Sequence, residues 1–134
     1  MLDAIRRHTK LAALIALGVL VVGGGWGWEF SASLRGRTAA HFDVARGRYQ
    51  ILGYGLPAAW QPEYAWLLRQ RYGIEYRAVA GCIVSRSLVD YVDGYDSVSA
   101  AAAKRRFGRD VFRECSADAS MHWEHRAAAN AHKE

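Results

Sequence analysis

The chain has 134 residues, of which 51% are hydrophobic and 23% charged, and this composition excludes a disordered or collagen-like protein. Its length accommodates at most one compact domain of ordinary size. The net charge of +5 comes from 18 Lys and Arg against 13 Asp and Glu. Part of this excess lies within residues 1–10, and the rest is too diffuse to indicate a nucleic-acid surface. We therefore expect no nucleic-acid partner.

Residues 11–28, LAALIALGVLVVGGGWGW, carry no charge and follow a basic N-terminal stretch. A helix of this length rises about 27 Å, close to the thickness of the hydrocarbon core of a bilayer. Trp26 and Trp28 stand at its end, where indole rings favour the headgroup region. The pattern predicts one transmembrane helix, or uncleaved signal anchor, with the lipid bilayer as partner. The alternative is a cleaved signal peptide, which would leave a secreted module.

The basic residues around this segment predict its orientation. Arg6, Arg7 and Lys10 directly precede it, whereas Arg35 and Arg37 follow only after several residues. Cytoplasmic flanks carry the excess of Lys and Arg. We therefore expect a single-pass membrane protein with a cytoplasmic N-terminus (residues 1–10) and a C-terminal domain outside the cytoplasm, in the periplasm if the source is a bacterium.

After the anchor, residues 29–48 are predicted to form a basic linker helix with two Arg-Gly-Arg copies. A small α/β domain is expected over residues 49–117. Its first strand, residues 49–52, ends at the GYGLP turn, and its second alternates polar and apolar residues over 74–80. Between them, Pro62 begins a helix that Gly73 ends. Two strands joined through a helix are normally parallel, so we expect a two-stranded parallel core.

Two further helices complete the predicted β-α-β-α-α order. The first covers residues 87–106, with a weak point at Asp93-Gly94, and the second covers residues 110–117. Asp90, Asp93 and Asp96 follow one another at a spacing of three, which we interpret as a solvated outer face of the first helix. Residues 118–134 are expected to form a flexible polar tail. The predicted fold class is thus a small α/β domain preceded by one transmembrane helix.

Cys82 and Cys115 are the only cysteines, and they are a candidate disulfide. The bond would close a loop of about 33 residues, worth about 3–4 kcal/mol in the chain-entropy estimate, and it requires an oxidising compartment. Two inert thiols are the alternative. A third possibility is a nucleophilic Cys82, because VAGC ends a strand before a helix, but no histidine lies near it in the sequence. No other catalytic residue is expected.

Three aromatic residues, Tyr54, Trp60 and Trp66, are candidates for a binding surface, because Tyr and Trp are enriched at interface hot spots. His122 and His125 could bind a metal, but two ligands are too few for a zinc site. We therefore expect no metal or cofactor. The leading hypothesis is a membrane-anchored, non-enzymatic binding or accessory module with a membrane-protein partner or self-association. The alternatives are a small thiol-dependent enzyme centred on Cys82 and a secreted module.

Overall fold

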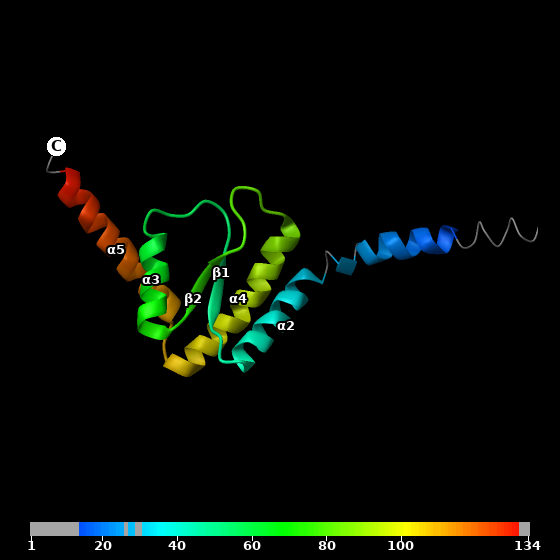
Figure 1. Cartoon of the computed structure of the whole chain (residues 1–134), viewed down its shortest axis with the longest axis horizontal. Helices are drawn as coiled ribbons and strands as arrows, with labels where there is room; N and C mark the ends of the chain where they lie inside the picture. Colours follow the sequence, from blue (N-terminus) through cyan, green and yellow to red (C-terminus); the bar gives the residue numbers. More distant parts are fainter. Residues whose placement is uncertain (1–13, 26, 29–30, 132–134) are drawn as a thin grey trace, which may run out of the picture.

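The computed structural model describes residues 14–25, 27–28 and 31–131. These residues are 72% helical, in five helices, and their only sheet is two-stranded and parallel (Figure 1). The predicted α/β class is therefore wrong, and the chain is mostly helical. The physical reason is that each strand has only four residues, whereas the four helices after residue 31 have 12 to 22.

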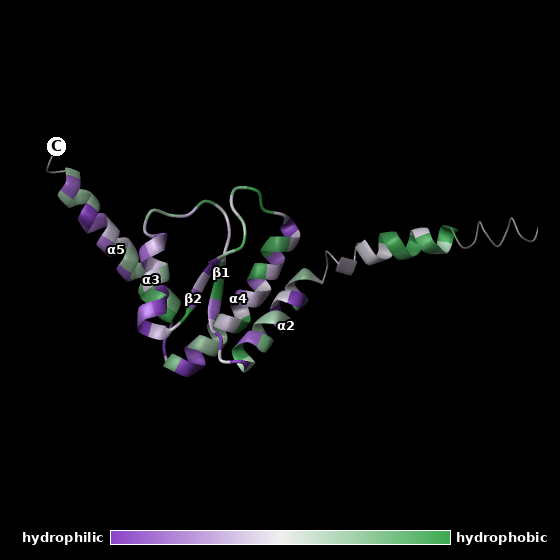
Figure 2. Ribbon diagram, in the orientation of Figure 1, coloured by the Kyte–Doolittle hydropathy of each residue, from purple (hydrophilic) through white to green (hydrophobic). Residues whose placement is uncertain are grey.

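The N-terminal helix comprises residues 14–25 and 27–28, and all of these are exposed. Figure 2 shows its strongly apolar character. Among the described residues, however, no helix combines the length and the hydropathy that crossing a membrane requires. The predictions of a transmembrane helix over 11–28, of a single-pass membrane protein and of an extracytoplasmic domain are therefore wrong. Residues 1–13 and Trp26 lie outside the described residues.

The two strands are β1 (Gln50–Gly53) and β2 (Glu75–Ala78), and α3 (Gln61–Tyr72) connects them. Their register pairs Gln50 with Glu75 and Gly53 with Ala78. Helix α4 (Arg86–Phe107) contacts β1 and packs against α2 (Ala32–Ala45), while α3 contacts β2 and packs against α5 (Val111–Ala131) (Figure 1). The sheet thus lies between the α2–α4 pair and the α3–α5 pair.

Local signals explain where the helices begin and end. Pro62 lies in the first turn of α3, and Gly73, with φ of 65°, ends it in the left-handed conformation. The Ser85 hydroxyl accepts a hydrogen bond from the N–H of Leu88 and caps α4, which ends at Gly108 with φ of 72°. These signals set the bounds of α3 and α4.

Glycines allow α2 and α4 to pack with their backbones in contact. A Cβ atom at Gly36 would overlap the carbonyl oxygen of Tyr91, and one at Gly94 would overlap that of Ser33. Gly94 therefore does not break α4, which runs unbroken over 22 residues. Helix α2, which covers much of the predicted linker, packs in this way against the domain.

The buried apolar residues form one cluster on each face of the sheet. The first joins α3, α5, Ala103 of α4 and Ile74, directly before β2, and it includes Leu67, Leu68, Val111 and Cys115. The second joins α2, α4 and β1 and comprises Ala40, Leu52, Val92 and Tyr95. Helix α5 continues through Ala131, into the residues of the predicted tail.

Candidate functional site

The outer edge of β1 is closed by two side chains of α4. The N–H of Leu52 donates to Asp96 Oδ1 at 2.9 Å, and the Ser99 hydroxyl donates to the carbonyl oxygen of Gln50. Burial raises the pKa of Asp96 to about 6, although the hydrogen bond from Leu52 opposes the rise. Asp96 therefore does not belong to the solvated face on which the sequence placed it.

The two loops that follow β1 and β2 lie at the same end of the molecule, because the strands are parallel (Figure 1). A crevice of about 400 Å³ opens between them. Residues 53–55, Pro57 and Gln61 line it on one side, and Tyr76 with residues 78–81 on the other. Crevices at the carboxyl ends of parallel strands are the usual ligand sites of open parallel sheets. This crevice is the candidate site.

Tyr76 provides the polar group at the centre of the crevice. Its ring lies over Gly53, where any Cβ atom would overlap the Tyr76 hydroxyl. The Gln61 side chain donates to this hydroxyl oxygen and accepts a hydrogen bond of 3.0 Å from the N–H of Ala58. Gln61 thus ties the loop after β1 to β2. Among the described residues, no acceptor is bonded to the Tyr76 O–H, so its hydrogen can be donated to a ligand.

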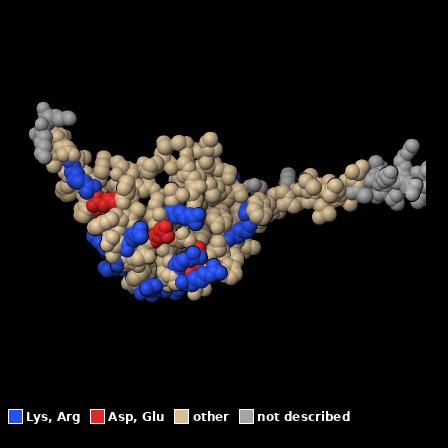
Figure 3. Space-filling model, in the orientation of Figure 1, with Lys and Arg blue, Asp and Glu red and all other residues tan. Residues whose placement is uncertain are grey.

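The crevice is electrically neutral at its surface. None of its ten lining residues is Lys, Arg, Asp or Glu. On the face drawn in Figure 3, the loop end is free of charged side chains, whereas Lys and Arg gather toward the opposite end. Burial first, and the nearby Asp96 second, raise the pKa of Tyr76. The hydroxyl therefore stays protonated at neutral pH, and the charge of Asp96 that raises this pKa also disfavours an anionic ligand.

The three predicted aromatic binding residues do not share one surface. Tyr54 is 41% exposed and lines the crevice. Trp60 packs edge-on against Tyr64, with ring centroids 5.9 Å apart, and belongs to the core. Trp66 is 59% exposed and lies beside β2, against Glu75 and Tyr76.

The two cysteines are free, so the predicted disulfide is wrong. Cys82 is exposed in the loop after β2, whereas Cys115 is buried near the start of α5. The unbroken α4, about 33 Å long, separates these two positions along the chain. Burial raises the pKa of the Cys115 thiol. No hydrogen bond joins Cys82 to a histidine in the part of the chain that the structure describes.

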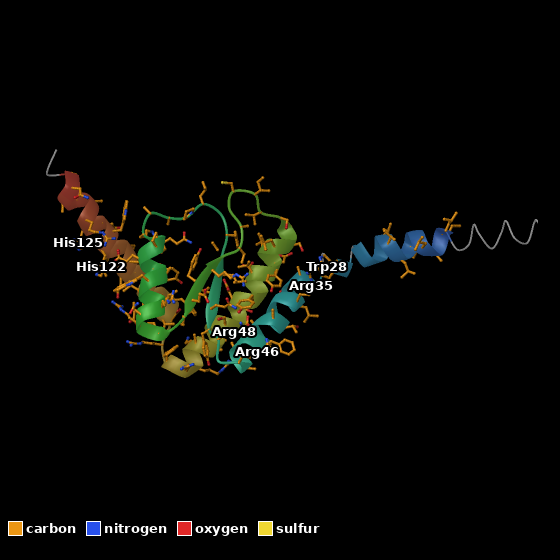
Figure 4. All side chains as sticks on the ribbon, viewed as in Figure 1. Trp28, Arg35, Arg46, Arg48, His122 and His125 are labelled. Carbon is orange, nitrogen blue, oxygen red and sulfur yellow. The ribbon has the colours of Figure 1, made fainter. Side chains whose placement is uncertain are left out.

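The histidines of α5 lie away from the crevice loops (Figure 4). The ring nitrogen Nδ1 of His122 lies 2.7 Å from Glu63 Oε1, and Arg126 binds the other oxygen of the same carboxylate. The hydrogen bond from Arg126, followed by that from His122, holds the pKa of Glu63 below its usual value. Within residues 14–25, 27–28 and 31–131, no three potential metal ligands form a cluster that includes His122 or His125.

Trp28 contacts the start of α2 rather than the crevice (Figure 4). The guanidinium carbon of Arg35 lies 3.8 Å from the centroid of its ring, and Arg35 Nη2 donates to the Trp28 carbonyl oxygen at 2.9 Å. This is a cation–π contact at an exposed position. It connects the N-terminal helix to α2.

Sequence reasoning found Tyr54 but missed Gln61, Tyr76 and Asp96. Tyr76 stands at an apolar position of the alternating pattern, which predicts only a half-buried strand, and Asp96 has the spacing of a solvated helix residue. The one available signal was Gly53 at the end of a strand, since such a glycine often marks the close approach of another group.

No family model, curated protein or solved structure that was compared with this chain matches it. Function is therefore inferred from the geometry of the crevice.

Proposed function

We propose that the protein binds a small, uncharged polar ligand in the crevice between the loops after β1 and β2, and that a sugar unit is the class that fits best. One observation carries the proposal. The Tyr76 hydroxyl donates its hydrogen to none of the described residues, and none of the residues that line the crevice is charged. The volume of about 400 Å³ lies within the range of about 300–1,000 Å³ that is typical of ligand sites.

A sugar matches the distribution of groups in the crevice. The Tyr54 ring offers an amphipathic aromatic face at the edge of the crevice. The Tyr76 O–H donates to a ligand oxygen, while Gln61 holds the hydroxyl in place. Peptide groups of the glycine-containing loops provide further donors and acceptors. A phosphorylated or carboxylated ligand would find no cation among the lining residues, and the charge of Asp96, which already raises the pKa of Tyr76, would disfavour it.

The test is calorimetric titration of the full chain with glucose and N-acetylglucosamine, with glucose 6-phosphate as the charged comparison. We expect at least one neutral sugar to bind and glucose 6-phosphate to bind at least tenfold more weakly. Tyr76→Phe should weaken binding about two- to tenfold, because a lost hydrogen bond of this kind costs about 0.5–1.5 kcal/mol. Gln61→Leu should also weaken binding, because the Tyr76 hydroxyl loses the side chain that holds it in place.

Tyr72→Phe is the matched control. It also removes a tyrosine hydroxyl, which donates to Glu114 at 2.8 Å, but it lies at the other end of α3. Its sugar affinity should equal that of the unmodified chain. Equal affinity for the neutral and the phosphorylated sugar, or an unchanged affinity in Tyr76→Phe, would overturn the proposal.

A further inference from the structure

The two outer edges of the sheet differ in their hydrogen bonding. In the parallel register, Glu75 donates to Tyr49 and Val79 donates to Gly53, so alternate residues of β2 face β1. The backbone groups of Tyr76 and Ala78 consequently point away from β1. Asp96 and Ser99 of α4 close the edge of β1, but no hydrogen bond between described residues closes the edge of β2 at Tyr76 or Ala78.

The open edge of β2 is accessible to another chain. Glu75, Arg77 and Ala78 are exposed and Tyr76 is half-buried. A hollow of about 240 Å³ lies beside the strand, between Glu75 and Tyr76 on one side and Trp66 and Arg69 of α3 on the other. Unpaired strand edges accept a further strand through backbone hydrogen bonds.

We infer that β2 pairs with β2 of a second copy of the chain, in antiparallel orientation about a two-fold axis at Tyr76. The outward N–H and C=O of Tyr76 then exchange two hydrogen bonds with Tyr76 of the second copy. The result is a continuous four-stranded sheet in the order β1-β2-β2-β1. The pairing leaves the crevice free, because the Tyr76 hydroxyl reaches toward Gly53 and away from this edge.

The charges on β2 favour this partner and this register. With Tyr76 opposite itself, Glu75 of each copy lies directly opposite Arg77 of the other, which gives two ion pairs of opposite charge. The next hydrogen-bonding register is centred on Arg77 and places the two Arg77 side chains opposite each other. Like charges directly opposite are destabilising. The self-complementary order Glu-Tyr-Arg therefore selects one pairing of two identical strands.

Helix α3 supports the same arrangement. Its Trp66 is 59% exposed beside the open edge, on the same side of the strand as Tyr76. The two-fold axis at Tyr76 brings α3 of the two copies side by side, so that both Trp66 side chains approach the axis. An exposed Trp thereby becomes buried, as is common at interface hot spots.

Charge reversal of the full chain tests the inference by sedimentation equilibrium. The single variants Glu75→Arg and Arg77→Glu each replace the two ion pairs by two pairs of like charges. Each should weaken the dimer at least tenfold. The double variant E75R/R77E restores both opposite pairs and should dimerise within about threefold of the unmodified chain. A monomeric unmodified chain would overturn the inference. So would equal association of the three variants, for example through the apolar N-terminal helix.

Two further measurements do not depend on charge. Ala78→Pro removes an N–H that points away from β1, so it should abolish dimerisation and leave the helical circular dichroism unchanged. Amide hydrogen exchange should show the N–H of Tyr76 protected in the dimer and unprotected after dilution, while that of Arg77 is protected in both. A Tyr76 amide that exchanges at the same rate in dimer and monomer would exclude the β2 edge as the interface.

Discussion

The carboxylate of Asp96 should make the protein less stable at neutral pH than at mildly acidic pH. Its pKa is raised from 3.8 to about 6 in the folded chain, so the folded state holds the proton more tightly than the unfolded state. The free energy of unfolding therefore falls as the pH rises from about 4 through about 6, and it is level above that range. Below pH 4 both states are protonated, and this group contributes no further change.

The magnitude follows from the size of the shift. A rise of the pKa from 3.8 to about 6 corresponds to about 3 kcal/mol for a fully shielded group. Because Asp96 is half-buried, about 1–2 kcal/mol is expected after allowance for solvent screening. Asp96→Asn removes the charge and retains an oxygen that accepts from the N–H of Leu52. It should raise the free energy of unfolding by about this amount at pH 8 and leave it unchanged at about pH 3, where Asp96 is protonated in both states.

Urea unfolding of the unmodified chain and of Asp96→Asn, from about pH 3 to about pH 8, measures the effect. Asp90→Asn is the matched control, because Asp90 lies on the same helix, 44% of its side chain is exposed, and it pairs with the exposed Arg86 at 3.9 Å. Asp96→Ala should be less stable at every pH, since the N–H of Leu52 loses its acceptor. An Asp96→Asn variant that is no more stable than the unmodified chain at pH 8 would refute the reasoning.

Two other predictions concern packing and the cysteines. Gly36→Ala should lower the free energy of unfolding by about 1–3 kcal/mol, because its methyl group would push α2 away from the backbone of α4. Gly18→Ala, where the added methyl group meets open space, should leave the free energy of unfolding unchanged. Thermal unfolding of both variants measures the difference, and equal melting temperatures would contradict the prediction. Iodoacetamide should alkylate only the exposed Cys82 in the folded chain, and both Cys82 and the buried Cys115 in urea. Intact mass counts the adducts, and two adducts on the folded chain would contradict this prediction.

The elements that local residues determine were the easiest to predict. Pro62 and Gly73 bound α3 in both the sequence pattern and the structure, and the intervening helix implied parallel strands. These features depend on dihedral preferences and chain connectivity, which are local. The fold class was wrong because it gave the strands too much weight and the helices too little.

The remaining features depend on tertiary contacts. Gly94 resembled a helix break, because the sequence does not show that α2 lies against it and that the close contact excludes a larger residue. Asp96 resembled a solvated residue, because nothing local indicates that it meets the edge of β1. The segment 11–28 is uncharged, but among the described residues no helix has both the length and the hydropathy that crossing a membrane requires, so the absence of charge was not sufficient for the prediction. Tyr54 was the one crevice residue found, and it was found by its residue type.

The most direct test of the proposed function is a ¹H–¹⁵N NMR titration of the full chain with N-acetylglucosamine. The account predicts saturable shifts of the amides of residues 53–55 and 78–81 and of the side-chain amide of Gln61, with the amides of α5 unmoved. Shifts that are absent at saturating sugar, or that map to the surface around His122 and Glu63, would contradict it.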